Sequence, residues 1–339
     1  MAITFEETEL HGQVPDLSNR GGWRTVSLRW RRDPLTGHGA RLLSGTKLQP
    51  ASRPELHDLT ATPAFCPFCA AHLEQATSPF PTELVPEGRI QRGAAVAVPN
   101  VMAYATHSAV GIYDPARHFV DLPDLTPRLV ADGIATLVEH TAAVRRADPQ
   151  AAWSSINANY LPPSGSSLVH PHLQSCHDRV GLTVQRQLVA ASRQRGGSYL
   201  EELVAIEQGG PRWVGRIGRV AWLTPFAPMG FHEVWGVVSD ASDIVGLAGD
   251  DVDALGEGLS RVLRVYARWN LASFNFALTG GGPDAATAGW RVLLRVVSRS
   301  APEPYYRSDA TYFERLYGEA LIDQAPEDVA AGLSAAFAG

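Results

Sequence analysis

The pattern of apolar and polar positions occurs twice along the chain. Residues 96–114 and 221–239 align without a gap at an offset of 125 residues, which matches His107 with His232 and Gly111 with Gly236. Each copy has two apolar runs separated by a turn that contains proline, and this pattern is typical of an antiparallel strand pair. The repeat therefore predicts two units of similar architecture.

A segment with the apolar spacing of an amphipathic helix follows each strand pair. In the first copy Thr126 offers an N-cap and Pro127 the first helical position. In the second copy we expect Asp250 to cap a stretch with the same spacing. Both helices are predicted to cover a sheet.

A strand that contains asparagine comes next, at residues 153–160 in the first copy and 271–278 in the second. We match Asn157 of the first strand with Asn275 of the second. A loop that contains glycine then leads to the last strand of each copy.

The last strands are predicted at residues 168–175 and 290–298. The order strand, strand, helix, strand, strand is thus used twice, and it favours an α+β fold over alternating βαβ units. We expect two tandem units, each an antiparallel sheet covered by helices. Residues 1–180 form the predicted catalytic unit, and residues 181–339 form the unit for substrate binding and dimerisation.

Composition and charge limit the possible partners. The chain has 339 residues, of which 45% are hydrophobic, and its formal net charge is −6. It lacks the basic character of nucleic-acid-binding proteins, and no apolar run reaches the roughly 18 residues of a membrane helix. The acidic stretch Met1–Leu10 has no basic segment of a secretory leader. We expect a cytoplasmic protein with a small partner and with no nucleic acid or membrane partner.

Cys66 and Cys69 have the spacing with which two thiolates bind one zinc ion. A redox pair is an alternative, but such a pair usually opens a helix after a strand, which is not predicted here. Two buried cysteines without a ligand are a third possibility. Among the histidines, His170 and His172 stand out because alternate positions of a strand lie on one face.

A loop rich in glycine and serine, Ser164–Ser167, precedes these two histidines. Its backbone N–H groups and hydroxyls can bind an anion, and Gln174 extends the same strand face. An imidazole can attack phosphorus when a neighbouring acceptor holds the proton of its other nitrogen. The loop and the histidines together indicate phosphoryl or nucleotidyl transfer.

These motifs resemble the galactose-1-phosphate uridylyltransferase family of the histidine-triad superfamily over most of the chain. The matching segments are Arg32–Gly37 (RDPLTG), Cys66–Cys69 (CPFC), Pro99–Asn100, Asp114–Leu125 and Asn159–Gln174 (NYLPPSGSSLVHPHLQ). The resemblance implies that His172 becomes covalently nucleotidylated and that Gln174 donates to the phosphoryl oxygens.

The resemblance also implies a structural Zn²⁺ and a set of binding residues. They are, by ligand, Cys66, Cys69, His118 and His170 for zinc; Phe68, Asn100, Asn159, Gly165, Ser166 and Ser167 for the nucleotide; and Lys47 and Arg307 for the rest of the substrate. It further implies a homodimer.

The chain departs from the family pattern in its second unit. Leu293 and Arg295 stand where the family has a metal-binding His-x-His, so we expect no metal there. Ser308 and Ala320 stand at the positions where the family has the lysine and glutamine that contact the hexose and its phosphate. We therefore expect a nucleotidyltransferase that moves NMP from a nucleoside diphosphate derivative to a phosphorylated acceptor other than galactose 1-phosphate. The alternatives are a phosphorylase or hydrolase of a dinucleotide or nucleotide sugar, and a non-catalytic nucleotide-binding protein.

Overall fold

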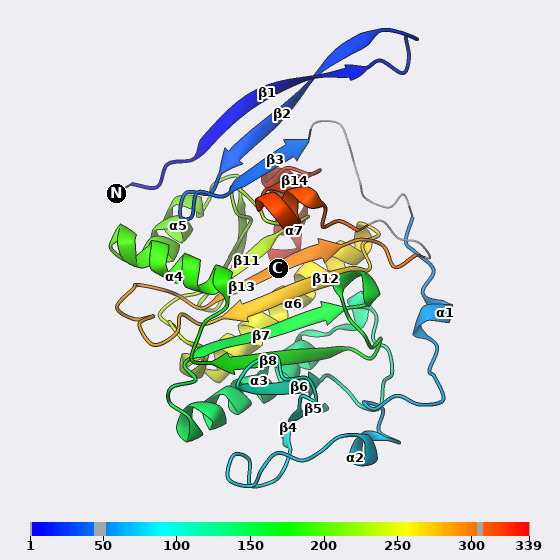
Figure 1. The fold of residues 1–339 in the computed structure, drawn as a ribbon, viewed down its shortest axis with the longest axis vertical. Coiled ribbons are helices and arrows are strands. Elements are labelled where there is room, and N and C mark those ends of the chain that lie inside the picture. Colours follow the sequence, from blue (N-terminus) through cyan, green and yellow to red (C-terminus); the bar gives the residue numbers. More distant parts are fainter. Residues whose placement is uncertain (1, 44–51, 304–307, 339) are drawn as a thin grey trace.

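A ten-stranded antiparallel sheet forms the centre of the fold within residues 2–43, 52–303 and 308–338, which the computed structural model describes (Figure 1). From one edge to the other its strands are β4 (Ile90–Arg92), β5 (Ala95–Pro99), β6 (His107–Ile112), β8 (His172–Asp178), β7 (Trp153–Tyr160), β12 (Ser273–Thr279), β13 (Leu293–Arg299), β11 (Val234–Val238), β10 (Val220–Leu223) and β9 (Trp213–Ile217). We call it the main sheet.

The α+β class is confirmed, but the two predicted sheets are the halves of this one main sheet. Each predicted unit supplies neighbouring strands, and β7 pairs with β12 where the halves meet. Asn159 lies opposite Asn275 in this pairing. Periodicity within each copy predicts strands, but it does not show that the edge strands of the two copies pair with each other. The division of the chain at residue 180 stays a prediction.

The strand register corrects the residue matching between the copies. Gly111 pairs with Leu173, and its counterpart Gly236 pairs with Leu294, so β13 matches β8 with Leu294 in the place of Leu173. It follows that Leu293 takes the place of His172, and Arg295 that of Gln174. The predicted match of Asn157 with Asn275 is wrong by the same register, because Asn157 faces Gln174 whereas Ala277 faces Arg295.

The last strand of the first copy starts later than predicted. Strand β8 begins at His172, so His170 lies in the bend before the strand. Pro171 has no N–H to donate to a strand ladder, which explains why pairing begins only after it. The predicted strand at residues 290–298 likewise begins late, at Leu293.

Two long helices, α3 (Pro127–Ala147) and α6 (Gly249–Arg268), cover one face of the main sheet. Thr126 caps α3 as predicted, since its side chain accepts from Leu129 N. Asp250 is not the cap of α6, because that helix begins at Gly249. The helices approach closely at Gly256, where a Cβ would lie 2.7 Å from the carbonyl oxygen of Pro127.

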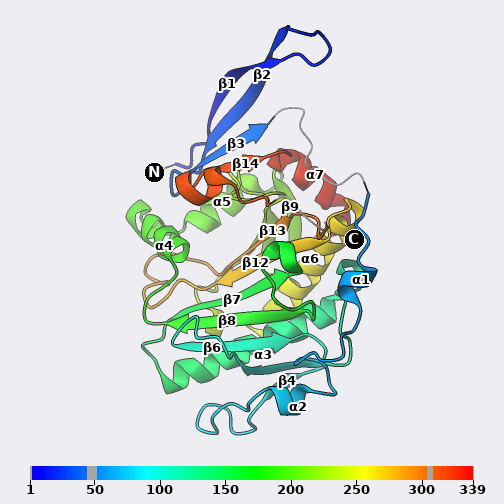
Figure 2. The same ribbon diagram turned by 45° about the vertical axis from the view of Figure 1, so that its right-hand side comes forward.

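A smaller sheet joins the two ends of the chain (Figure 2). Its order is β1 (Glu6–Pro15), β2 (Trp23–Arg32), β3 (Gly39–Leu43) and β14 (Ala320–Ile322), and the hairpin of β1 and β2 extends away from the body. The remaining α-helices are α1 (His57–Thr60), α2 (Leu73–Ala76), α4 (Thr183–Arg195), α5 (Tyr199–Glu207) and α7 (Pro326–Phe337). None of the described helices is long and apolar enough to cross a membrane.

Candidate active site and metal centre

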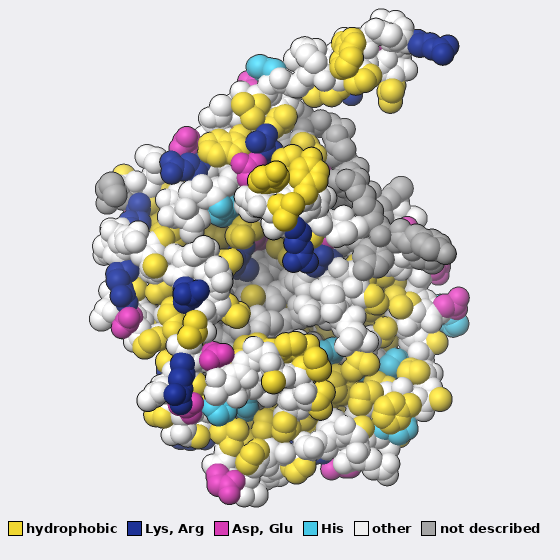
Figure 3. Space-filling view, viewed as in Figure 1, with side chains coloured by type: hydrophobic (Ala, Val, Ile, Leu, Met, Phe, Trp, Pro, Cys, Tyr) yellow, Lys and Arg dark blue, Asp and Glu magenta, His cyan; other side chains and the backbone are white. Residues whose placement is uncertain are grey.

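Polar side chains gather at the centre of the sheet face that turns away from α3 and α6. Leu173 packs into the core, so its neighbours His172 and Gln174 on β8 point to the opposite, open face. Asn157 lies directly across from Gln174 on β7, and Asn159 follows it on the same face. The middle of this face is hollowed, with Arg side chains along the rim of the hollow (Figure 3).

The imidazole of His172 is buried, with 8% of its surface exposed. Its Nδ1 lies 2.8 Å from the carbonyl oxygen of His170, which can only accept, so Nδ1 carries the proton. Burial lowers the pKa of His172, and the bond to the carbonyl partly opposes this effect. The ring is therefore neutral at pH 7 with its lone pair on Nε2. Phe68 packs its ring against the imidazole, with centroids 5.1 Å apart.

The loop from Leu161 to Ser167 connects β7 with the histidines. Leu161 has a φ of 68°, which lies in a backbone region that residues other than glycine rarely adopt. The Ser164 hydroxyl donates to the Leu161 carbonyl at 2.7 Å and supports this turn. Ser166 uses its hydroxyl to donate to the carbonyl of Leu168. Among the described residues, no acceptor is paired with the backbone N–H of Ser166 or Ser167, so these groups remain available to an anion.

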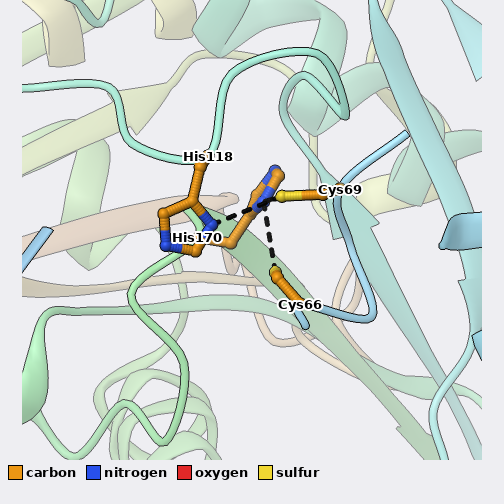
Figure 4. A group of neighbouring side chains, drawn as sticks. All are labelled: Cys66, Cys69, His118 and His170. Atoms are coloured by element: carbon orange, nitrogen blue, oxygen red, sulfur yellow. Dashed lines mark hydrogen bonds between the residues drawn. The ribbon is translucent and has the colours of Figure 1, made fainter. Parts of the chain in front are cut away.

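Cys66, Cys69, His118 and His170 form one cluster, as predicted (Figure 4). Nδ1 of His170 lies 3.6 Å from both sulfurs, and Nδ1 of His118 lies 3.4 Å from the sulfur of Cys69. A tetrahedral zinc ion, with bonds of roughly 2.3 Å to sulfur and 2.0 Å to nitrogen, holds such atoms about 3.5 Å apart. The donor types and their spacing therefore fit a tetrahedral metal ion.

The surroundings of the cluster prepare the donors for a cation. Nε2 of His170 donates to the carbonyl oxygen of Asp114 at 3.1 Å, which directs the Nδ1 lone pair towards the sulfurs. Burial lowers the pKa of His170 to about 4, so its ring is neutral. Burial, followed by the nearby Cys66 sulfur, raises the pKa of the Cys69 thiol to about 11. A thiolate at this position needs a cation beside it.

The other predicted binding residues lie around this centre or outside the described part of the chain. Asn100 follows β5, and its Oδ1 accepts from Met102 N while its buried Nδ2 has no partner in the described residues. Gly165 is exposed at the loop tip. Lys47 and Arg307 lie outside the described residues.

Sequence reasoning missed polar residues of the second half that reach the same face. Arg299 donates to Asn275 and forms an ion pair with Asp309. These three side chains border a cavity of about 210 Å³, which Arg315 also lines. Arg295 instead forms an ion pair with Glu233, whose side chain is buried. The alternation of polar positions along β13 was the available signal, but it does not identify their partners.

Other proteins resemble this chain in sequence and in structure. No family model matches the chain. An uncharacterized protein from Archaeoglobus fulgidus is 28% identical over 305 residues, which cover 88% of this chain and 89% of that protein.

Two solved structures share the fold. An ADP-glucose phosphorylase from Arabidopsis thaliana with bound ADP-glucose has a TM-score of 0.69 at 18% identity, over 90% of this chain and 97% of the other. A uridylyltransferase has a TM-score of 0.64 at 22% identity, over 91% of this chain and 98% of the other. The chain therefore has the same fold as these two structures.

Proposed function

We propose that this chain is a nucleotidyltransferase that transfers NMP from a nucleoside diphosphate derivative to a phosphate-bearing acceptor through a covalent bond to His172. The observation that carries the proposal is the hydrogen bond from Nδ1 of His172 to the carbonyl oxygen of His170, at 2.8 Å. This bond leaves the Nε2 lone pair available as a nucleophile, on a sheet face that also holds Gln174 and Asn159.

Two displacement steps follow from this arrangement. The Nε2 lone pair attacks the α-phosphorus, and the bond from phosphorus to the bridging oxygen breaks as the leaving phosphate departs with its electron pair. The ring keeps its Nδ1 proton, so the charge of the adduct is stabilised by the carbonyl of His170. An oxygen of the acceptor phosphate then attacks the same phosphorus, the N–P bond breaks, and the neutral imidazole is restored.

The neighbouring groups have separate tasks in these steps. Gln174 and the unpaired backbone N–H groups of Ser166 and Ser167 donate to the phosphoryl oxygens, where negative charge develops. The unpaired Nδ2 of Asn100 fits a ribose hydroxyl. Phe68 lies against the His172 ring and borders the place for the base.

We assign Zn²⁺ to the cluster of Cys66, Cys69, His118 and His170, because two thiolates and two imidazoles at tetrahedral spacing are a typical set for structural zinc. When bound, the ion supplies a rigid anchor to the chain just before β8. His170 connects the two sites, since its ring belongs to the cluster and its carbonyl oxygen orients His172.

The acceptor separates the possible reactions. A phosphorylase passes the nucleotidyl group to inorganic phosphate, as the name of the structurally similar ADP-glucose phosphorylase indicates for that protein. A transferase passes the group to another phosphorylated molecule, and a hydrolase passes it to water. The same first step serves all three reactions.

The decisive experiment is the intact mass of the protein after separate incubation with UDP-, ADP-, GDP-, CDP- and TDP-glucose. We expect a mass increase of one NMP with at least one donor, and that donor identifies the base. Portions of the adduct are then incubated with buffer alone, with inorganic phosphate, or with a hexose 1-phosphate, galactose 1-phosphate included. The addition that restores the original protein mass identifies the acceptor class.

His172→Asn is the matched control, since it keeps a polar side chain of similar size but removes the attacking nitrogen. We expect this variant to bind the donor nucleotide in equilibrium dialysis and to form no adduct. An adduct on the Asn variant, or none on the wild type with any donor, contradicts the proposed mechanism.

A further inference from the structure

A chain of directional hydrogen bonds links the second half of the main sheet to Asn159. Asp309 accepts from Nε and Nη2 of Arg299 at 2.7 and 2.6 Å. Nη1 of Arg299 donates to Oδ1 of Asn275 at 2.6 Å. Nδ2 of Asn275 in turn lies 2.6 Å from Oδ1 of Asn159 and 3.0 Å from the carbonyl oxygen of Ser164.

The partners of Asn275 fix which end of its amide faces which neighbour. The guanidinium of Arg299 has only donors, so the amide oxygen must face it. On the other side stand the carbonyl oxygens of Ala158 and Ser164, which only accept, so the NH₂ group must face them. Both sides require the same orientation, and the alternative would place like groups against each other twice.

This orientation determines the polarity of Asn159. The NH₂ group of Asn275 meets the Asn159 side chain, so Asn159 must present its oxygen there. Its own NH₂ group is then left without a partner among the described residues, on the open face that carries His172. An NH₂ group donates to a phosphate oxygen, whereas an amide carbonyl in its place would repel the anion.

We propose that Arg299 and Asn275 are positioning residues, which orient the Asn159 amide with its NH₂ group towards the phosphate of the nucleotide. This inference rests on the proposed function. The same Asn275 amide also donates to the carbonyl oxygen of Ser164, at the start of the loop Ser164–Ser167. The second half of the sheet, which lacks a counterpart of His172, thereby sets the hydrogen-bonding polarity of the site in the first half.

Arg299→Met tests the start of this chain, because it removes the donors and keeps most of the side-chain stem. We expect the rate of adduct formation, with the donor found above, to fall by roughly 10- to 100-fold, as for other residues that orient a contacting group. Arg219→Met is the matched control, because Arg219 forms a comparable bidentate ion pair with Asp251 in the first turn of α6. We expect the control to change the rate by less than about twofold.

A double-mutant cycle separates positioning from a general loss of structure. In the Asn159→Ala background the amide that Arg299 orients is absent, so we expect Arg299→Met to lower the rate by less than about twofold further. An undiminished effect in that background overturns the inference. Asn275→Asp is the second variant if Arg299→Met fails to fold. It keeps the acceptor for Arg299 but loses the donor to Asn159, and wild-type rates in this variant also overturn the inference.

A measurement without turnover distinguishes this inference from the proposed function. In ¹⁵N-labelled protein the side-chain NH₂ signals of Asn159 are identified by their loss in Asn159→Ala. We expect Arg299→Met to shift these signals and Arg219→Met to leave them in place. If the wild type forms no adduct with any donor but the shift is seen, the proposed function fails and the hydrogen-bond chain stands. If the signals do not move, the chain does not orient Asn159.

Discussion

A buried pair of histidines should make the folded protein sensitive to acid. His140 on α3 and His177 on β8 lie on the helix side of the main sheet, and each is at most 1% exposed. Nδ1 of His140 is 3.2 Å from Nε2 of His177, and Nδ1 of His177 is 3.1 Å from the hydroxyl of Ser154. The ring of Phe80 stacks on His140 with centroids 5.0 Å apart. No carboxylate is among these contacts, so nothing here favours a charged ring.

Burial is the main cause that lowers both pKa values, to about 4 for His140 and about 2 for His177. The positive charge of His107 adds to the effect at both rings. In the unfolded chain a histidine takes up its proton near pH 6.5, so below that pH the unfolded state binds more protons than the folded state. The stability from the neutral pair is therefore complete above pH 6.5 and is lost as the pH falls.

The size of the loss follows from the shift. Each histidine that stays neutral in the folded state lowers the free energy of unfolding by about 1.4 kcal/mol per pH unit below 6.5. For His140 the loss ends near its folded pKa of about 4 and reaches about 3 kcal/mol. Together the two histidines give a slope of about 2.7 kcal/mol per pH unit. The pair then costs about 4 kcal/mol at pH 5 and about 6 kcal/mol at pH 4, so a domain near the lower end of the usual range of roughly 5–15 kcal/mol is close to unfolding there.

The assay is urea unfolding, followed by tryptophan fluorescence, at pH 7.5, 6.5, 5.5 and 5.0, for the wild type and for His140→Gln with His177→Gln. Glutamine retains hydrogen bonding but does not titrate. The difference in slope between the two proteins isolates the pair, because the metal cluster and all other groups titrate alike in both. We expect the wild type to lose about 2.7 kcal/mol per pH unit more than the variant below pH 6.5.

Parallel pH curves for the two proteins would refute this reasoning, since they mean that the pair takes up protons equally well in the folded and unfolded states. Where the double variant is too unstable at pH 7.5, His140→Gln alone serves, with half of the slope difference expected. Proton release on refolding at pH 5.5, measured by potentiometry, provides an independent check. A release below one proton per chain also contradicts the prediction.

Three further changes test other parts of the structure. Metal analysis should find one zinc ion per chain in the wild type and none in Cys66→Ser, and the variant should have a lower melting temperature, since one of four donors is lost; equal zinc content in both proteins would exclude the assigned site. Gln174→Ala should slow adduct formation by about 10², the effect of one donor at a developing negative charge, without changing zinc content; an unchanged rate removes Gln174 from the mechanism. Gly258→Ala should destabilise the fold by about 1–3 kcal/mol in urea unfolding, because the new Cβ would lie 2.1 Å from the Trp222 ring, a clash larger than the helix propensity gained; greater stability would show that the ring can move aside.

The local pattern of the sequence predicted eight of the ten strands of the main sheet and the two long helices that cover it, but it did not predict the smaller sheet. The internal repeat identified both strand pairs and both covering helices, because a buried face imposes a period of about two on strands and 3.6 on helices. The ends of elements were less well predicted where single residues decide them. Pro171 delays the start of β8, and α6 begins one residue before the expected cap Asp250.

The metal cluster was predicted in two steps. The spacing of Cys66 and Cys69 favoured a metal-binding pair, because two thiolates at this spacing can bind one zinc ion. The other two ligands, His118 and His170, came only from the resemblance to the uridylyltransferase family. The structure brings all four together, although His118 and His170 are distant in sequence from the cysteines.

What only the tertiary structure decided is which polar side chains meet. Asn275 contacts Asn159 across 116 residues of sequence because β7 and β12 pair, and Arg299 reaches Asn275 from β13. The alternation of polar and apolar residues along a strand predicts which face of the sheet a side chain occupies. It does not identify the neighbouring strand or the register in which the two strands pair. The sequence therefore determined the repeated strands, the two long helices and the cysteine pair. Strand pairing, which depends on the burial of the whole sheet, decided the register and with it the contacts of the two asparagines and Arg299.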